Sequence, residues 1–136
     1  MTDHVDSSKR SMMMAAVHAK DTEPEMVVRK IVHSMGYRYR LHAKELPGKP
    51  DLVFSRRRKI IFVHGCFWHR HEACARASIP KTRVDFWQRK FDANIARDKI
   101  VIRSLRRDGW RVMTVWQCEL KSAERLTKRL KRFLGD

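Results

Sequence analysis

Residues Lys59–Cys74 read KIIFVHGCFWHRHEAC, and the rest of the chain can be interpreted around this stretch. The apolar run that ends at Val63 does not alternate with polar residues, which is typical of a strand buried on both faces of a sheet. Val63–Cys74 then holds three of the chain's seven histidines and two of its three cysteines. Because imidazole and thiolate are the usual zinc ligands and imidazole titrates near neutral pH, this composition indicates metal binding, acid–base chemistry or both.

A second strand precedes this stretch. Asp51–Phe54 and Lys59–Val63 lie on either side of three consecutive arginines. We expect the two segments to form a hairpin that is symmetric about residue 57, with Asp51 opposite Val63. One carboxylate would then stand beside the start of the His/Cys stretch.

A helix and an edge strand are predicted farther upstream. Thr22–Glu25 (TEPE) has the signals of a helix start, because a threonine can cap the helix and a proline suits its first turn. Apolar residues then recur at helical spacing until Gly36, which ends the pattern. Tyr37–Leu41 alternates aromatic and aliphatic residues with basic ones, as a half-buried edge strand does.

The segments downstream predict a helix, a strand and a last helix. Thr82–Asp85 repeats the capping pattern, and an apolar helical stripe continues to Gly109 with a candidate break near Asn94. Trp110–Trp116 is the next strand. Strand, helix and strand therefore follow in the order of a right-handed parallel crossover. Ser122–Leu134 is a final helix covered in Lys and Arg.

Length and charge limit the class of protein. The chain has 136 residues, enough for one domain with a core, and 31 Lys and Arg against 15 acidic residues give a net charge of +16. Such an excess indicates a polyanionic partner, for which nucleic acid is the obvious candidate. No apolar run is long enough to span a membrane and the polar opening lacks a signal-peptide pattern, so we expect a protein that stays inside the cell.

The cysteines predict a zinc site. Three cysteines in an intracellular chain favour metal ligation or catalysis over disulfides. Parallel strands end at the same edge of a sheet, so Cys118, just past the later strand, should approach Cys66, just past the earlier one. With His71 and Cys74 they would complete the Cys3His tetrahedron of a structural Zn2+ site. The alternative is buried thiols beside a solvated histidine. A closed four-ligand site could not activate water, so hydrolysis would occur elsewhere.

A second site is predicted around Asp51. A carboxylate beside the main-chain carbonyl of Val63 at a strand end suits Mg2+, which takes oxygen ligands and keeps several waters for phosphate chemistry. Glu25 could reach that ion through water. It could instead complete the capping box of the first helix.

Two histidines are left over from the zinc set, namely His64 and His69. A neutral histidine near the metal could take the proton of an attacking water, while a second holds a phosphate oxygen or the leaving group. Asp98 could orient His69 in the manner of an Asp–His pair. The alternative roles are a satisfied core histidine for His64 and a helix-surface charge for Asp98.

Aromatic and methionine side chains offer a stacking surface. Phe67 and Trp68 are adjacent in a polar loop, and Trp87 lies at the head of the next helix. Packing around the zinc loop is one interpretation. Insertion between base pairs is the other, since aromatic side chains stack on bases with roughly 1–3 kcal/mol each. In the basic arm of residues 1–20, the apolar run around Met14 is either a docked helix or a wedge for the minor groove.

Several long motifs closely resemble those of one family, the very-short-patch repair (Vsr) endonucleases. The resemblance covers roughly residues 8 to 120 and is densest from 47 to 118. It is carried by Pro47-Gly48-Lys49-Pro50-Asp51, Phe62-Val63-His64-Gly65-Cys66-Phe67-Trp68-His69, Phe86-Trp87, Asn94 through Asp98, Gly109-Trp110-Arg111-Val112, and Val115-Trp116-Gln117-Cys118.

The resemblance implies a restriction-endonuclease-like α/β fold, a mixed central sheet flanked by helices, in a single domain over residues 1–136. It also implies a Mg2+-dependent nick on the 5′ side of a thymine mispaired with guanine, the lesion left when 5-methylcytosine deaminates. The partners to expect are double-stranded DNA with a T:G mismatch and, downstream, mismatch-repair proteins and a DNA polymerase. We expect a monomer in the bacterial cytoplasm, associated with the nucleoid and not with a membrane.

The resemblance also suggests roles for individual residues. Those that resemble the family's catalytic set are Asp51, His64, His69, Asp98 and Glu25. Asp51 and the Val63 carbonyl would bind the metal, while His69 looks like the general base with Asp98 as its partner. The residues that match the structural zinc ligands are Cys66, His71, Cys74 and Cys118. Phe67 and Trp68 resemble the wedge that enters the DNA beside the mismatch, and the further candidate DNA contacts are Trp87 and Met14.

Two other classes of function fit some of the same features. A zinc-stabilised DNA-binding module without catalysis would explain the charge, and it would bind duplex DNA identically with and without Mg2+. A general restriction-type or Holliday-junction nuclease would explain the metal site. Such a nuclease should cut matched or branched DNA as readily as a mismatch.

Overall fold

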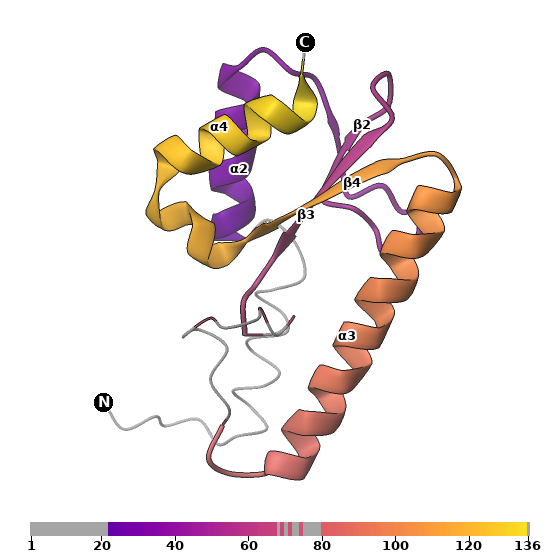
Figure 1. Ribbon diagram of the computed structural model, residues 1–136, viewed down its shortest axis with the longest axis vertical. Coiled ribbons are helices and arrows are strands. Elements are labelled where there is room, and N and C mark those ends of the chain that lie inside the picture. The colour runs from indigo at the N-terminus through magenta and orange to yellow at the C-terminus, as the bar shows by residue number, and fades with distance from the viewer. Residues whose placement is uncertain (1–21, 68, 70, 72–73, 75–79, 136) are drawn as a thin grey trace.

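A four-stranded mixed sheet organises the fold (Figure 1). The computed structural model describes residues 22–67, 69, 71, 74 and 80–135. The strands are β1 (Arg40–Leu41), β2 (Leu52–Phe54), β3 (Lys59–His64) and β4 (Arg111–Trp116), and they lie in this order across the sheet. β1, β2 and β3 pair antiparallel, whereas β3 and β4 are parallel, which confirms the parallel pairing of the crossover. The arm of residues 1–20 and the connection 75–79 lie outside the described residues.

Helices cover both faces of this sheet (Figure 1). α2 (Glu23–Ser34) and α4 (Ala123–Leu134) pack together on one face, and α3 (Val84–Arg107) packs on the other. A short 3-10 helix, η2 (Gln117–Lys121), leads from β4 to α4. None of the helices in the described ranges is both long and apolar enough to cross a membrane.

β3 is buried on both faces, as its sequence predicts. Ile61 belongs to the core shared with α2 and α4, whereas Ile60 and Phe62 belong to the core on the α3 side. All three side chains are 5% exposed or less. The end of β3, from which the His/Cys stretch continues, is therefore held from both sides.

The start of α2 follows the predicted signals. The Glu25 N–H donates to Thr22 Oγ1 at 3.4 Å, and a proline occupies the first turn. Gly36, with a φ of +87°, follows the last turn in a conformation that side chains with a Cβ rarely adopt. The predicted edge strand is present, but its ladder is only two residues long, Arg40–Leu41.

The register of the hairpin differs from the prediction by one residue. Leu52 pairs with Ile61, which places Asp51 opposite Phe62 rather than Val63. Four residues connect β2 and β3, so the hairpin is centred between two residues instead of on one. The Asp51 side chain nevertheless reaches the expected place, because the Val63 N–H donates to its Oδ2 at 2.7 Å.

α3 also differs from the prediction at its start. Its N-cap is Arg83, in a left-handed conformation (φ 54°) and without a side-chain cap hydrogen bond, so the predicted capping by Thr82 is wrong. The helix runs without interruption through Asn94, where the sequence suggested a break. The absence of Gly and Pro from residues 84–107 explains this continuity.

Candidate active site and metal centre

The candidate residues gather at the edge of the sheet where both parallel strands end. His64, the last residue of β3, is in register with Trp116, the last residue of β4. Just beyond them, the Cys118 N–H donates to Cys66 Sγ at 3.3 Å. The approach of these two cysteines, which the parallel crossover predicts, is confirmed.

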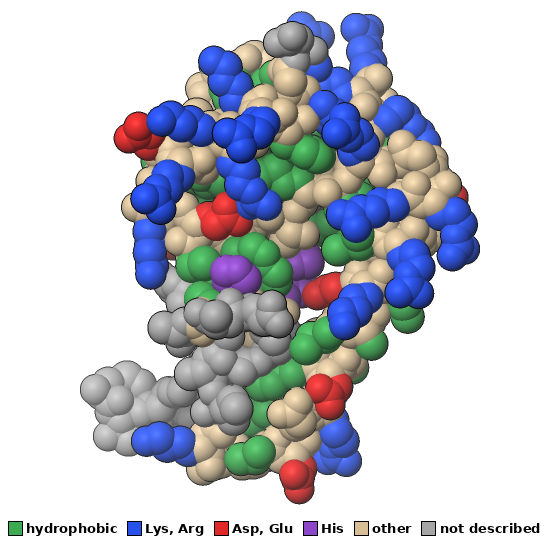
Figure 2. Space-filling view, viewed as in Figure 1, with side chains coloured by type: hydrophobic (Ala, Val, Ile, Leu, Met, Phe, Trp, Pro, Cys, Tyr) green, Lys and Arg blue, Asp and Glu red, His purple; other side chains and the backbone are tan. Residues whose placement is uncertain are grey.

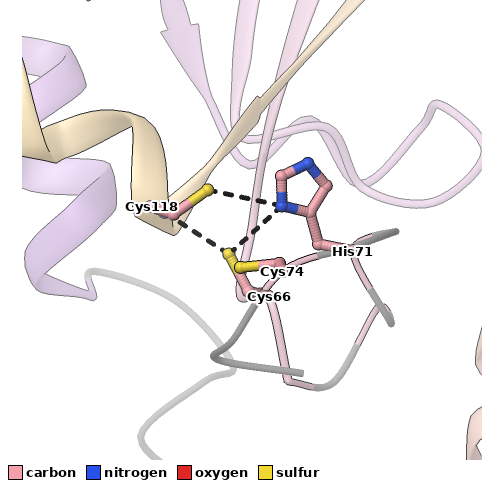
Figure 3. Close-up of side chains that lie close together, drawn as sticks. All are labelled: Cys66, His71, Cys74 and Cys118. Carbon is pink, nitrogen blue, oxygen red and sulfur yellow. Dashed lines mark hydrogen bonds between the residues drawn. The ribbon is translucent and has the colours of Figure 1, made fainter. Parts of the chain in front are cut away.

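Four side chains at this edge form a cluster with the composition of a structural zinc site (Figure 3). The ligand atoms of Cys66, His71, Cys74 and Cys118 all lie within 4.8 Å of one another. His71 Nδ1 is 3.3 Å from Cys118 Sγ and 3.7 Å from Cys66 Sγ. Three thiols and one imidazole at this spacing fit the tetrahedral coordination of Zn2+.

The surroundings of Cys66 determine whether its thiol ionises. Its side chain is fully buried, and burial raises the pKa of the thiol to about 12, with the Cys118 N–H opposing the shift and the neighbouring thiols adding to it. A metal ligand must be a thiolate, and a thiolate in this environment needs a positive charge beside it. The raised pKa by itself keeps the thiol neutral, so it is the composition and spacing of the four side chains that fit a metal site.

Trp116 lies between the Cys/His cluster (Cys66, His71, Cys74 and Cys118) and the two remaining histidines. Its ring stacks on the His71 ring, with centroids 4.3 Å apart and an interplanar angle of 13°. The same indole meets the His64 ring edge-on at 5.4 Å. The Trp116 side chain thus contacts His71 of the Cys/His cluster and His64 of the histidine pair. A displacement of the cluster would therefore displace His64 as well.

His64 and His69 stack face to face. Their ring centroids are 3.8 Å apart and the rings are nearly parallel, at 6°. His69 Nδ1 lies 2.6 Å from Asp98 Oδ2, and Asp98 projects from α3. The carboxylate therefore fixes the orientation of the His69 ring, and the other ring nitrogen, Nε2, is the one suited to accept a proton.

The same residues line a cavity with Asp51. The cavity has a volume of about 220 Å3, and its lining includes Asp51, Val63, His64, His69 and Asp98. Figure 2 shows histidine and acidic side chains together at the hollow between α3 and the rest of the molecule. The cavity therefore brings together the candidate metal-binding carboxylate and the candidate base.

Asp51 is poised to exchange a proton for a cation. Burial raises its pKa from 3.8 to about 7; the Val63 N–H opposes this shift, whereas the negative charge and the side-chain hydrogen bond of Glu25 add to it. Two carboxyl groups that share a hydrogen bond retain a proton near neutral pH. A divalent cation could take the place of that proton, and carboxylate oxygens are the ligands that Mg2+ prefers.

Glu25 has partners that its sequence position did not reveal. Its side chain is 2% exposed, and Oε2 contacts both the Arg29 guanidinium and His42 Nε2, the latter at 2.7 Å. The carboxylate is therefore engaged with these two side chains, and the capping-box role that we considered does not describe its contacts. Glu25, His42 and Asp51 form a third group of potential metal ligands within 4.8 Å of one another.

Sequence comparison identifies the family. The family model described as "DNA mismatch endonuclease Vsr" matches residues 2–76. The Type II nicking enzyme V.XorIIP of Xanthomonas oryzae pv. oryzae is 49% identical over 134 residues, which are 98% of each chain. The DNA mismatch endonuclease Vsr of Escherichia coli is 40% identical over 127 residues, 93% of this chain and 81% of that relative. The chain belongs to the Vsr family of DNA mismatch endonucleases.

The Vsr-family match extends over the whole region that carries the site. The Type II nicking enzyme V.NmeAIP of Neisseria meningitidis aligns over all of this chain at 42% identity and over 96% of its own length. Membership of an endonuclease family makes the protein a DNA-cleaving nuclease. A zinc-stabilised binding module without catalysis is therefore no longer a competing interpretation.

The aromatic candidates of this Vsr-family chain are packed together where they are described. Phe67 meets the rings of Trp87 and Phe91 edge-on, at 5.5 and 5.2 Å. Trp87 is 5% exposed, which fits the packing interpretation of that side chain in the DNA-free protein. Trp68 and Met14, the other two candidate DNA contacts, lie outside the described residues.

His42 and Arg29 are among the residues beside the candidate site that the sequence did not single out. Arg29 stands on α2 one turn after Glu25, a spacing that allows an ion pair and could have signalled the contact. His42 follows the short strand β1 in a loop without a motif. Its position depends on the pairing of β1 with β2, which no local pattern specifies.

Proposed function

We propose that this Vsr-family endonuclease nicks one strand of duplex DNA on the 5′ side of a thymine mispaired with guanine, by Mg2+-dependent hydrolysis. The observation that carries the proposal is the cavity in which Asp51 faces the His69–Asp98 pair. A carboxylate for the cation and an oriented base are the two components that phosphodiester hydrolysis needs. The restriction-endonuclease-like classification of the mixed sheet and its flanking helices is part of the same proposal.

The Mg2+ ion would be held by Asp51 and the main-chain carbonyl of Val63, with Glu25 reaching it through water. When bound, the ion neutralises charge on the phosphate and lowers the pKa of coordinated water. Because the Val63 N–H donates to Asp51 Oδ2, the other carboxylate oxygen would be available to the ion. The fit of the donors supports this assignment, since Asp51 is a partly buried carboxyl with a second carboxyl beside it.

His69 would act as the general base. As the water oxygen bonds to phosphorus, its proton passes to His69 Nε2, and the bond between phosphorus and the leaving oxygen breaks. Asp98, 2.6 Å from Nδ1, stabilises the imidazolium that results. This arrangement lets the base take a full proton without first reorienting.

His64 would serve the other end of the reaction. Its ring is stacked on His69 at 3.8 Å, and two imidazolium ions face to face repel each other. As His69 gains the proton of the water, this repulsion would favour transfer of a proton from the His64 imidazolium to the leaving oxygen, which leaves His64 neutral. His64 could instead hold a phosphate oxygen. The stack couples the two proton transfers.

The zinc cluster would be structural. A Zn2+ ion bound by Cys66, His71, Cys74 and Cys118 has no open coordination position, so its role would be to fix the loop that carries His69. Phe67, Trp68, Trp87 and Met14 are the proposed DNA contacts. We extend the proposal to a monomer in the bacterial cytoplasm, at the nucleoid, that hands the nick to mismatch-repair proteins and a DNA polymerase.

One assay tests the reaction. Cleavage of T:G, fully matched and branched duplexes is measured on each strand, with and without Mg2+. The proposal expects a single nick, 5′ of the thymine, only in the T:G duplex and only with Mg2+. Equal cutting of matched or branched DNA would instead support a general restriction-type or junction nuclease, and cleavage in a metal chelator that spares the zinc would refute the Mg2+ assignment.

A further inference from the structure

The carboxylate of Glu25 is held through a single oxygen. Its Oε2 contacts the Arg29 guanidinium and lies 2.7 Å from His42 Nε2, while those two side chains are themselves 3.4 Å apart. Because a carboxylate oxygen only accepts hydrogen bonds, His42 donates through Nε2. With Oε2 fixed in this way, Oε1 is the oxygen left to face the neighbouring acid.

His42 is also tied to the candidate metal ligand on the other side. Its main-chain N–H donates to the main-chain carbonyl of Asp51 at 3.2 Å. The same residue therefore joins α2, through Glu25, to the residue before β2. The side chain and the main-chain N–H of His42 thus hold Glu25 and Asp51 at a fixed separation.

The backbone of His42 is held in a costly conformation. Its φ of 47° lies in the left-handed region, which few residues with a Cβ adopt. Histidine, asparagine and aspartate tolerate this region better than most residues do. Such a conformation persists where the surrounding contacts require it, and here they are the contacts to Glu25 and Asp51.

We propose that His42 is a positioning residue which, together with Arg29, turns the Glu25 carboxylate toward Asp51 and thereby sets the affinity of the site for Mg2+. The inference rests on the proposed Mg2+ site and deepens it. His42 does not bind the ion in this proposal; it acts through Glu25. Groups that orient the ligands of a metal typically change its affinity by about 10- to 100-fold when they are removed.

Two substitutions separate the hydrogen bond from His42 to Glu25 from the effect of the left-handed backbone conformation at position 42. His42→Asn keeps a residue that tolerates the left-handed conformation, but its amide is too short to reach Glu25 Oε2. His42→Gln places an amide N–H near the position of His42 Nε2, in a residue that fits the backbone less well. The exposed histidine of α2, His33, gives the matched control His33→Asn.

Each variant is measured in two ways, by the Mg2+ dependence of T:G nicking and by the rise in Tm that Mg2+ causes in the full-length, zinc-loaded protein. We expect His42→Asn to raise the half-saturating Mg2+ concentration roughly tenfold in both measurements. Its nicking rate at saturating Mg2+ should change far less. His42→Gln and His33→Asn should stay within about twofold of the wild type in both measurements.

Three results would overturn the inference. One is an unchanged half-saturating concentration in His42→Asn. Another is an equal loss in His42→Asn and His42→Gln, which would mean that the imidazole itself is needed, as in a direct metal ligand. If His42→Asn fails to fold, Arg29→Gln replaces it, and a wild-type Mg2+ dependence in that variant would equally contradict the role given to Glu25 Oε2.

The proposed reaction can fail separately from this inference. Asp51→Asn should lose both the nicking and the Mg2+-induced rise in Tm. If Asp51→Asn keeps them, the Mg2+ site itself is misassigned. If Asp51→Asn loses them and His42→Asn behaves as the wild type, only the positioning role is wrong.

Discussion

At the scale of single residues, His69 is the proposed general base of the reaction. We expect His69→Ala to slow nicking by roughly 100- to 10,000-fold, the usual contribution of a general base. Asp98→Asn should also slow the reaction, because it weakens the contact that orients the ring, but it leaves the base in place. Single-turnover nicking at saturating Mg2+ measures both effects.

A matched control for Asp98 exists on the same helix. Asp92 is exposed on α3 and bonded only to Gln88 among the contacts described for it, at 2.9 Å. Asp92→Asn should therefore nick at the wild-type rate. A wild-type rate in His69→Ala would remove His69 from the chemistry.

The raised pKa of the partly buried Asp51 predicts a stability that depends on pH in the absence of Mg2+. Burial raises its folded-state pKa from 3.8 to about 7. Such a shift stabilises the folded protein below about pH 4, and this contribution is lost as the pH rises through about 7. Asparagine has no proton to lose, so Asp51→Asn should exceed the wild type in Tm at about pH 8, by roughly 5 °C, and much less at about pH 5.

Thermal unfolding without added Mg2+ measures this difference, with Asp92→Asn as the control that should show none. Adding Mg2+ at about pH 8 should narrow the gap by stabilising only the wild type, since the ion binds the ionised carboxylate. If the gap between Asp51→Asn and the wild type were the same at both pH values, the raised pKa would be contradicted.

At the scale of the secondary-structure elements, the Cys/His cluster links the end of β3 to the start of η2, and we propose that it binds zinc. We expect one zinc per chain by elemental analysis. Cys118→Ala should lose the zinc, lower the Tm and greatly reduce nicking even with Mg2+ present, because the cluster and Trp116 support the histidines.

The control for that variant comes from the same short helix. Lys121→Ala removes an exposed side chain of η2 and should keep a full complement of zinc. Zinc content is the decisive readout, because loss of a basic side chain can weaken DNA binding by itself. A zinc-free wild-type protein that nicks T:G DNA normally would contradict the supporting role.

Element order was the most informative part of the sequence. The unbroken apolar run of β3 and the strand–helix–strand order were enough to predict that Cys118 lies near Cys66. Parallel strands end at the same edge of a sheet, whatever their side chains are. The hairpin register depends on whether the turn contains an odd or an even number of residues. The three arginines do not specify that number. The start of α3 at Arg83 depends on a left-handed residue that no cap signal marks.

The candidate catalytic residues also differ in how far the sequence could predict them. His69 and Asp98 could be paired from the motif alone, because both positions resemble a known family. His42 could not be found, because its contact with Glu25 joins a loop to a helix that lies far away in sequence. Local sequence patterns predict helices and strands. A contact between a loop and a distant helix is seen only in the folded structure.

At the scale of the whole molecule, the net charge of +16 is the property that most affects binding to a polyanion such as DNA. Figure 2 shows Lys and Arg side chains over the region of α4 and along α3, on either side of the hollow with the histidines. A polyanion that crosses this hollow would meet positive charge on both sides. In the proposed reaction the charge would provide affinity for DNA, and the few residues of the cavity would carry out the chemistry.

We expect the affinity for duplex DNA to fall steeply with salt. Each phosphate that the protein neutralises adds roughly −0.9 to the slope of log affinity against log salt, so 6–10 contacts would lower affinity by about 1,000- to 100,000-fold between 50 and 200 mM. Binding of the uncleaving variant Asp51→Asn to a T:G duplex measures this slope. A nearly flat dependence would show that the basic surface does not contact the backbone.

Zinc binding by the Cys/His cluster would have one more consequence, which concerns the entropy of the unfolded chain. Cys66 and Cys118 are 52 positions apart, and the whole of α3 and β4 lies between them. A zinc ion held by both cysteines would close that loop, and a cross-link of this span removes conformational freedom from the unfolded chain worth about 4 kcal/mol. The metal would thus act on this crossover as a disulfide does, but as a cross-link that a chelator opens and a zinc salt restores.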